Sequence, residues 1–288
     1  MNPTDHSAAP PPPRCAFDLR WQGWSDRGRV RPNNEDSFLG LRFNDQELDL
    51  LGKSGEAGMA AHDFAFAVSD GMGGALAGEY ASRIALEKIK LLLPRTFSRR
   101  PDRPAPEPDG VLTKLFAEIH RALLFLGSGY PECAGMETTL TLAWLTPGRL
   151  HFGHIGDTRL YHLRRGEPAS LRQLTEDDTH VGWLYRQGKL NEREARQHPR
   201  RNVLQKALGG GNQFVTPQIG TVDCAAGDRF LICSDGLTEA FTRDQLAEVL
   251  AEVPLGASAT DNAAGDLVRT AVARDGRDNT TAVLLDLR

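Results

Sequence analysis

Several acidic residues in this chain are placed where metal ligands could stand. They are Asp70, Asp157, Asp235 and Asp278, which each end or flank a separate apolar run, and the adjacent pair Glu35 and Asp36. A strand that ends in aspartate beside glycine presents a carboxylate at a sheet edge, although one such pair is also ordinary turn chemistry. If the fold gathers these carboxylates, cations must lie between them, because like charges at short range repel strongly. The sequence therefore predicts a cage of oxygen ligands for metal ions.

The types of these ligands indicate which metals the cage would hold. No histidine or cysteine accompanies the carboxylates at matched spacing, and carboxylate oxygens favour magnesium, manganese or calcium over zinc or copper. Carboxylates that share one edge can hold two ions about 3.5 to 4 Å apart, with a water molecule between them. Such a water loses a proton near neutral pH and is suited to in-line attack on phosphorus.

A cation that binds the substrate phosphate would complete such a site. Arg31 lies four residues before Glu35 and five before Asp36, so it could emerge at the same edge of the sheet. A guanidinium group holds two phosphate oxygens with a planar fork, which a lysine cannot do. Taken alone, an arginine beside Pro32 is most often a solvated loop charge, but the neighbouring acidic pair favours a role in phosphate binding.

The apolar pattern predicts the elements that would position these residues. Strands are expected at residues 17–24, 37–43, 62–70, 138–145, 149–155, 158–164, 216–222, 229–235 and 281–287. Helices are expected at residues 77–93, 110–126, 243–251 and 262–273, the first ended by Pro94. The strands over 138–164 read as an antiparallel meander, and 45–61 and 94–109 as excursions without regular structure. This order indicates two sheets covered on both outer faces by helices.

Composition excludes several classes of protein. The 288 residues, 40% hydrophobic and 25% charged, are typical of a soluble globular protein. A net charge of −4 gives no general attraction to nucleic acid, and no apolar run approaches the roughly 18 to 20 residues that span a bilayer. Residues 1–14 read as a disordered proline-rich tail without a signal core, and the cysteines read as small core residues in a reducing compartment. We therefore expect a cytoplasmic protein, and a monomer.

A series of motifs resembles one known family. RPNNEDSF, VSDGMGG, ETTLTL, GDTRLY, LTEDD, RNVLQKALG, LICSDGL and RDNTTAVLL occur in this order. Together they resemble the serial motifs of the metal-dependent, type-2C protein phosphatases, and DGMGG resembles the bacterial branch. Each motif alone is a weak signal, but the ordered set is specific and covers residues from about 17 to 287.

The resemblance implies a fold and a role for each residue. The fold would be α+β, a four-layer αββα sandwich of two mainly antiparallel sheets, with two manganese or magnesium ions between them. Residues 15–288 would form one catalytic domain, in which 175–209 is a flap that touches substrates. The implied metal ligands are Asp36, Asp70, Asp235, Asp278 and the carbonyl of Gly71. Glu35 would hold metal-bound water, Arg31 would bind the phosphate, and Asp157 with Asp235 would form a third, weaker metal site.

The chain also departs from the family pattern. Met72 stands where eukaryotic members have the histidine proposed to protonate the leaving group, so no general acid is assigned. Asp178 stands where the flap usually has a histidine, and Thr158 replaces a more usual serine. His154 is expected to be a packed strand residue, and Glu239 could support the third metal or only cap or solvate a helix.

Three functions remain open from the sequence. The favoured one is a phosphoserine and phosphothreonine protein phosphatase that opposes a Ser/Thr protein kinase, with phosphorylated proteins as its partners. A catalytically inert relative that binds phosphoproteins is disfavoured, because none of the implied metal carboxylates is lost. A hydrolase of small phosphate esters or nucleotides is the third, although the sequence offers no glycine-rich phosphate loop for it.

Overall fold

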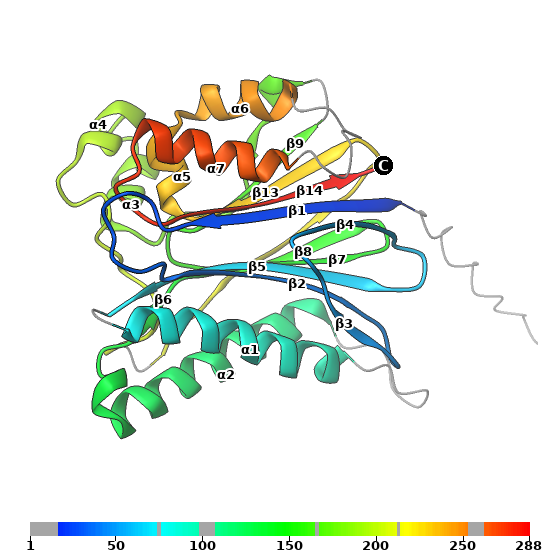
Figure 1. The fold of residues 1–288 in the computed structure, drawn as a ribbon, viewed down its shortest axis with the longest axis horizontal. Coiled ribbons are helices and arrows are strands. Elements are labelled where there is room, and N and C mark those ends of the chain that lie inside the picture. Colours follow the sequence, from blue (N-terminus) through cyan, green and yellow to red (C-terminus); the bar gives the residue numbers. More distant parts are fainter. Residues whose placement is uncertain (1–16, 74–75, 98–106, 165–166, 212–213, 253–261) are drawn as a thin grey trace, which may run out of the picture.

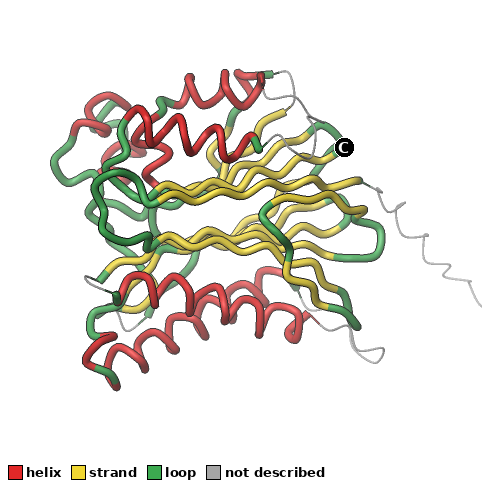
Figure 2. The backbone as a smooth tube through the Cα atoms, viewed as in Figure 1, coloured by secondary structure: helices red, strands yellow, loops and turns green. Residues whose placement is uncertain are grey.

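The computed structural model describes residues 17–73, 76–97, 107–164, 167–211, 214–252 and 262–288. These residues form four layers, in which two sheets pack face to face and helices cover both outer faces (Figures 1 and 2). The expected α+β sandwich of two antiparallel sheets flanked by helices is confirmed. The proline-rich tail and most of the expected loop at 94–109 lie outside the described residues.

The first sheet has six strands. Their order is β10 (Arg172–Gln173), β9 (Arg159–Arg164), β13 (Asp228–Cys233), β14 (Thr280–Leu287), β1 (Asp18–Asp26) and β4 (Ser54–Gly58). The second sheet has eight strands. They are β11 (Leu208–Gly209), β6 (Glu137–Thr138), β5 (Asp63–Met72), β7 (Leu140–Thr146), β8 (Arg149–Ile155) and β12 (Gln218–Asp223), with β2 (Asp36–Phe43) pairing β5 and β3 (Leu48–Leu50) pairing β2. Every pairing between these strands is antiparallel.

Helices form the outer layers and a small accessory segment. They are α1 (Ala77–Phe97), α2 (Pro108–Gly129), α3 (His180–Arg186), α4 (Glu192–Gln197), α5 (Asp235–Ala240), α6 (Arg243–Glu252) and α7 (Ala263–Arg274), with single 3₁₀ turns at Pro131–Cys133 and Pro168–Ser170. Helices α1 and α2 cover the second sheet, and α5, α6 and α7 cover the first (Figure 1). Helices α3 and α4 lie at one end of the sandwich, in the segment 175–209.

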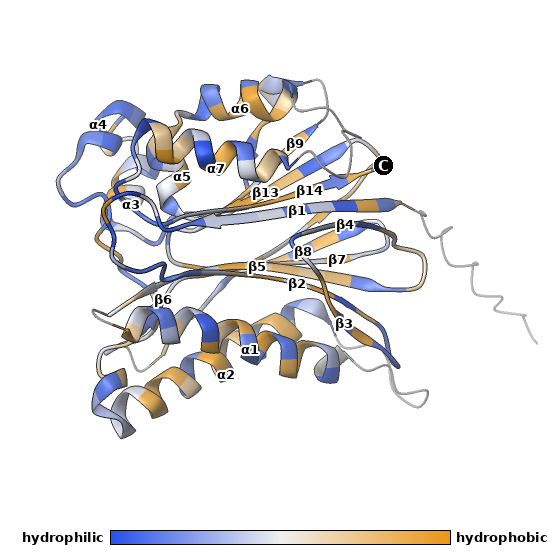
Figure 3. Cartoon of the chain, in the orientation of Figure 1, coloured by the Kyte–Doolittle hydropathy of each residue, from blue (hydrophilic) through white to orange (hydrophobic). Residues whose placement is uncertain are grey.

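Three apolar clusters hold the four layers together. One joins α1 and α2 to the second sheet, one lies between the sheets, and one joins the first sheet to α5, α6 and α7. Figure 3 shows hydrophobic residues along the central strands and a mixture of hydrophobic and hydrophilic residues on the covering helices. Because burial of apolar surface is the main favourable term in folding, these clusters fix the relative position of the two sheets.

The segment 45–61 was expected to lack regular structure, and this prediction is wrong. It contains β3 and β4, and β4 forms the edge of the first sheet beside β1. Trp21 of β1 lies across Gly55 so closely that a Cβ atom there would be 2.2 Å from the indole ring. The strand was hidden because an edge strand of small and polar residues has no continuous apolar pattern.

Two helix predictions also need correction. Helix α1 does not end before Pro94 but continues to Phe97. Proline removes one helical hydrogen bond, and only the last turn follows it here, while the preceding Leu93 is fully buried in the core. Helix α5 was not predicted. The strand expected at 229–235 ends at Cys233, and Asp235 begins this helix.

The most important correction concerns the expected meander over 138–164. Strand β8 pairs with β7, but β9 leaves this sheet and pairs with β13 in the other. The chain crosses between the sheets at Gly156, whose φ is 108° and whose Cβ, if present, would lie 2.6 Å from Thr139. Only glycine fits this turn, and the crossing carries Asp157 between the two sheets.

No helix in the described part of the chain combines the length and the apolar character that crossing a membrane requires.

Candidate metal centre

The predicted carboxylates converge from both sheets at one end of the sandwich. Asp36 on β2 is paired directly with Asp70 on β5, so their side chains start from neighbouring positions of the second sheet. Asp157 follows the crossing from β8, Asp235 is the first residue of α5, and Asp278 precedes β14. Strand β5 continues past Asp70 to Met72, because Gly71 pairs with Thr138.

Burial and mutual repulsion raise the pKa values of several carboxyls in this cluster. Burial raises the pKa of Asp70 well above its ordinary value, and the charges of the four other aspartates raise it further. Burial and the charge of Asp157 do the same for the pKa of Asp235. Burial raises the pKa of Asp36 to about 6 and that of Asp157 to about 7. Asp70 therefore lies at the centre of a group of carboxyls that do not ionise together without cations.

Two oxygens in this group have no partner. Asp36 Oδ1 and Asp235 Oδ1 are buried without a hydrogen bond, although Asp36 Oδ2 accepts one from Ser234 Oγ at 2.7 Å. A buried carboxylate oxygen without a donor is costly, and a divalent cation would satisfy it. These orphan oxygens are the observation that fits the residues to metal ions.

Hydrogen bonds within the protein engage two of the carboxylates in the cluster. Within the described residues, no group of three or more histidine, cysteine or acidic side chains is arranged to hold a metal ion. Asp278 Oδ2 instead accepts a hydrogen bond from Arg31 at 2.7 Å, and Ser234 holds one oxygen of Asp36. The Asp278 carboxylate thus joins the acidic cluster to Arg31.

Arg31 and Glu35 lie beside the cluster, as the sequence indicated. The Arg31 side chain is 50% exposed, and its hydrogen bond to Asp278 raises its pKa. Burial raises the pKa of Glu35, and the charge of Arg31 opposes that shift. The arginine thus stands at the rim of the cluster, with its guanidinium paired to the Asp278 carboxylate.

Gly71 and Asp70 are held in place through their backbone atoms. The Gly71 N–H donates to Glu35 O at 3.2 Å, and a Cβ at Gly71 would lie 1.9 Å from Gly78 O in α1. The Asp70 N–H donates to Thr139 Oγ1 at 3.0 Å, and Thr138 Oγ1 donates to Asp70 O at 2.8 Å. The threonine pair of the ETTLTL motif therefore fixes the strand from which Asp70 projects.

Asn279 is a supporting residue that sequence reasoning missed. Its Oδ1 accepts the Glu35 N–H at 2.8 Å, and its Nδ2 donates to Arg27 O and Asn33 O at 2.9 Å each. One buried side chain thus holds the loop that carries Arg31 and Glu35. Its only signal in the sequence is its place directly after Asp278.

Asn279→Ala is expected to lower the free energy of unfolding by about 2 to 4 kcal/mol, because three hydrogen bonds of about 0.5 to 1.5 kcal/mol each are lost. Urea unfolding of the metal-free protein measures this change. Asn44→Ala is the control, since Asn44 makes its hydrogen bonds in an exposed turn. Equal losses in the two variants would contradict the role of Asn279.

The turn that carries Asp157 is fixed by residues of two other elements. His154 Nε2 donates to Gly156 O and Glu176 O, both at 3.1 Å, and its Nδ1 accepts from Thr141 Oγ1 at 2.8 Å. Burial lowers the pKa of His154, so the ring is neutral and structural, as expected. Asp178, where the family usually has a histidine, accepts the Gly156 N–H at 3.2 Å.

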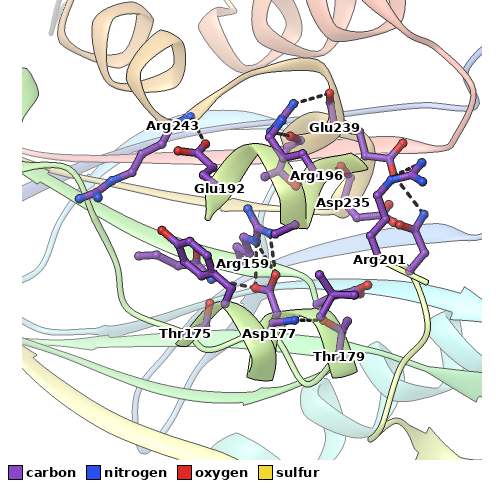
Figure 4. Close-up of a pocket in the computed structure, with 18 of the residues that line it drawn as sticks. Arg159, Thr175, Asp177, Thr179, Glu192, Arg196, Arg201, Asp235, Glu239 and Arg243 are labelled. Atoms are coloured by element: carbon purple, nitrogen blue, oxygen red, sulfur yellow. Dashed lines mark hydrogen bonds and ion pairs between the residues drawn. The ribbon is translucent and has the colours of Figure 1, made fainter. Parts of the chain in front are cut away.

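A pocket of about 510 Å³ adjoins Asp157 and Asp235 (Figure 4). Its walls come from β9, the segment 175–209, α5 and the start of α6. Arg159 is bound by both oxygens of Asp177, at 2.9 and 2.6 Å. The sequence left the role of Glu239 open. Its side chain accepts hydrogen bonds from Arg201 at 3.1 Å and from Asn202 at 3.0 Å, so it belongs to a network of charged and polar side chains.

Comparisons with known proteins identify the same family as the sequence motifs. A model of the family described as protein phosphatase 2C matches residues 57–270. Serine/threonine protein phosphatase PstP of Mycobacterium tuberculosis is 35% identical over 278 residues, which cover 95% of this chain and 46% of PstP. The chain therefore spans about half the length of that relative.

Other matches cover more than nine tenths of both chains. Serine/threonine phosphatase stp of Listeria monocytogenes is 29% identical over 262 residues, 91% of this chain and 93% of that protein. A crystal structure of the catalytic domain of PstP, in complex with two manganese ions, is 32% identical with a TM-score of 0.72. It covers 94% of this chain and 99% of that one.

Proposed function

The chain belongs to the protein phosphatase 2C family, and we propose that it hydrolyses phosphoserine and phosphothreonine in proteins, as a metal-dependent phosphatase of the bacterial type. The observation that carries this proposal is the convergence of buried carboxylates from both sheets, with orphan oxygens on Asp36 and Asp235. The manganese-bound PstP structure supports two manganese ions as the cofactor, with magnesium as the alternative.

The proposed ligands are the residues that the resemblance to the family implies, and their convergence at one end of the sandwich supports them. Asp36, Asp70, Asp235, Asp278 and the carbonyl of Gly71 would hold the two ions, and Asp157 with Asp235 would hold a third, weaker one. When bound, the ions would supply a Lewis-acid centre that acidifies water and neutralises charge on the phosphoryl oxygens. Glu35 would orient water by accepting its hydrogen bond.

Arg31 would bind the substrate phosphate. Its guanidinium is already at the rim of the cluster, and the phosphate would take over the hydrogen bond that Asp278 now accepts. This exchange would place the phosphoryl group beside the carboxylates. Arg31 therefore acts by orientation and charge, and it needs no change in its own protonation state.

Arg31→Ala is expected to raise KM for a phosphothreonine peptide about tenfold or more, with a smaller effect on kcat, because a charge-assisted contact is worth about 1.5 to 3 kcal/mol. Arg31→Lys should fall between, since it keeps the charge but loses the fork. Arg29→Ala is the control, because exposed Arg29 contacts Ala273 O, away from the cluster. An unchanged KM in Arg31→Ala would remove this residue from the site.

Substrates and partners follow from the same proposal. Phosphorylated proteins would be the substrates, and a Ser/Thr protein kinase that forms them would be the opposing partner. The cytoplasmic location and the monomeric state stay predictions from the sequence.

The proposal is tested by the choice of substrate. Purified protein is assayed for phosphate release from phosphothreonine and phosphoserine peptides, and from nucleotides, with manganese and with a chelator. We expect release from the peptides with manganese alone. Hydrolysis of nucleotides but not of peptides would overturn the proposal in favour of a small-ester hydrolase, and no hydrolysis of either would favour an inert relative.

A further inference from the structure

Helix α5 connects the predicted metal centre to the segment 175–209. It begins with Asp235, and its first turn packs so tightly that a Cβ at Gly236 would lie 2.1 Å from Asn279 O. The helix is only six residues long, so it has too few internal hydrogen bonds to hold its own position. The contacts at its other end therefore add to this packing in holding the helix, and with it Asp235, in place.

Arg196 of α4 makes those contacts. Its guanidinium donates to the carbonyl oxygens of Thr238 at 2.8 Å, Glu239 at 2.8 Å and Phe241 at 2.9 Å. The last carbonyls of a helix have no partner within the helix, and a cation there also interacts favourably with the helix dipole. Figure 4 shows Arg196 beside Glu239, near Asp235.

Further contacts hold α4 itself in place. Asn191 and Glu194 form a capping box at its start, which stabilises this short helix. Glu192, one turn before Arg196 on the same face, accepts the Arg243 N–H at the start of α6 at 3.4 Å. Opposite charges of α4 thus meet the end of α5 and the start of α6, each matched to the dipole of the helix it touches.

We propose that Arg196 is a positioning residue for the metal centre, which fixes α5 and through it the Asp235 carboxylate. This inference rests on the proposed function, because it requires Asp235 to be a metal ligand. Residues that orient metal ligands without touching the metal typically change metal affinity about 10- to 100-fold when they are replaced. Arg196 acts on Asp235 in this way from a separate segment of the chain.

The test measures manganese binding and does not depend on turnover. In metal-free protein titrated with manganese, Arg196→Met is expected to weaken at least one binding step about tenfold. Arg193→Met is the matched control, because Arg193 is exposed on the same helix and the two residue types have similar helix propensity. Arg193→Met should bind manganese within about twofold of wild type.

Hydrogen exchange of the metal-free variants gives a second readout. Amides of α5 should exchange faster in Arg196→Met than in Arg193→Met, whereas those of α1 should exchange equally. If Arg196→Met does not fold, Arg196→Lys takes its place, with an expected weakening of about threefold, because lysine cannot hold three carbonyls with a planar fork.

The outcomes separate this inference from the proposed function. Manganese affinity and α5 exchange equal to those of the Arg193 control would overturn the role of Arg196 and leave the phosphatase proposal standing. Wild-type protein that binds no manganese would overturn both.

Discussion

Asp70→Asn is expected to lower kcat/KM on a phosphothreonine peptide about a thousandfold, because the central carboxylate of the proposed metal centre is lost. Asp70 faces the charges of Asp36, Asp157, Asp235 and Asp278, so it is well placed to bind an ion together with them. The substitution keeps the shape of the side chain, and the hydrogen bonds of its backbone to Thr138 and Thr139 remain.

Asp70→Asn should not destabilise the metal-free protein. A loss of activity in this variant would therefore not be explained by misfolding. Burial raises the pKa of Asp70, which means that its ionised form is unfavourable in the metal-free fold. The substituted amide side chain carries no charge, so the metal-free variant should melt at the same temperature as wild type at pH 8, or higher. Asp223→Asn is the control, because Asp223 is exposed and only pairs with Arg149. Full activity in Asp70→Asn would remove this residue from the centre.

Manganese is expected to raise the melting temperature more at pH 8 than at pH 5.5. Burial raises the pKa of Asp36 to about 6 and that of Asp157 to about 7, above the ordinary value of 3.8. For an acid whose pKa is raised by folding, the stability contribution is present below the unfolded value. It is lost as the pH rises through the folded value, here between about pH 4 and 7. The metal-free protein is therefore destabilised as the pH rises, while the ionised ligands bind manganese more tightly.

The size of this effect can be measured by thermal melting. Saturation of two sites to about 100 times the dissociation constant adds about 5 kcal/mol, which corresponds to roughly 10 °C or more for a domain of this size. We expect about this increase at pH 8 and less than half of it at pH 5.5. Asp70→Asn should show a much smaller increase at both pH values. An equal or larger increase at pH 5.5 would contradict the proposed ligand set.

Much of the fold could be predicted from the sequence, because its long strands and helices have clear periodic patterns. Strand β4 and helix α5 could not, since the first is a short polar edge and the second directly follows a buried strand. The crossing at Gly156 was also hidden, because β8, a short turn and β9 read locally as a hairpin. Only the pairing of β9 with β13 shows that the chain changes sheets there.

The acidic residues of the site were visible in the sequence, but their supports were not. Carboxylates at strand ends are a strong signal, because their types limit the chemistry. Asn279, Ser234 and Arg196 act through hydrogen bonds to the backbone or to a ligand side chain, and nothing in their local sequence reveals those distant partners. The bond between Arg31 and Asp278 is likewise visible only in the structure.

The most direct test of the central claim is a manganese titration of chelator-treated wild-type protein, with phosphate release from a phosphothreonine peptide as the readout. If the converged carboxylates bind the ions that the reaction needs, the metal-free protein releases no phosphate. The rate then rises with manganese to a plateau, and Asp70→Asn stays near zero throughout. Phosphate release at the full rate in the presence of the chelator would contradict the account.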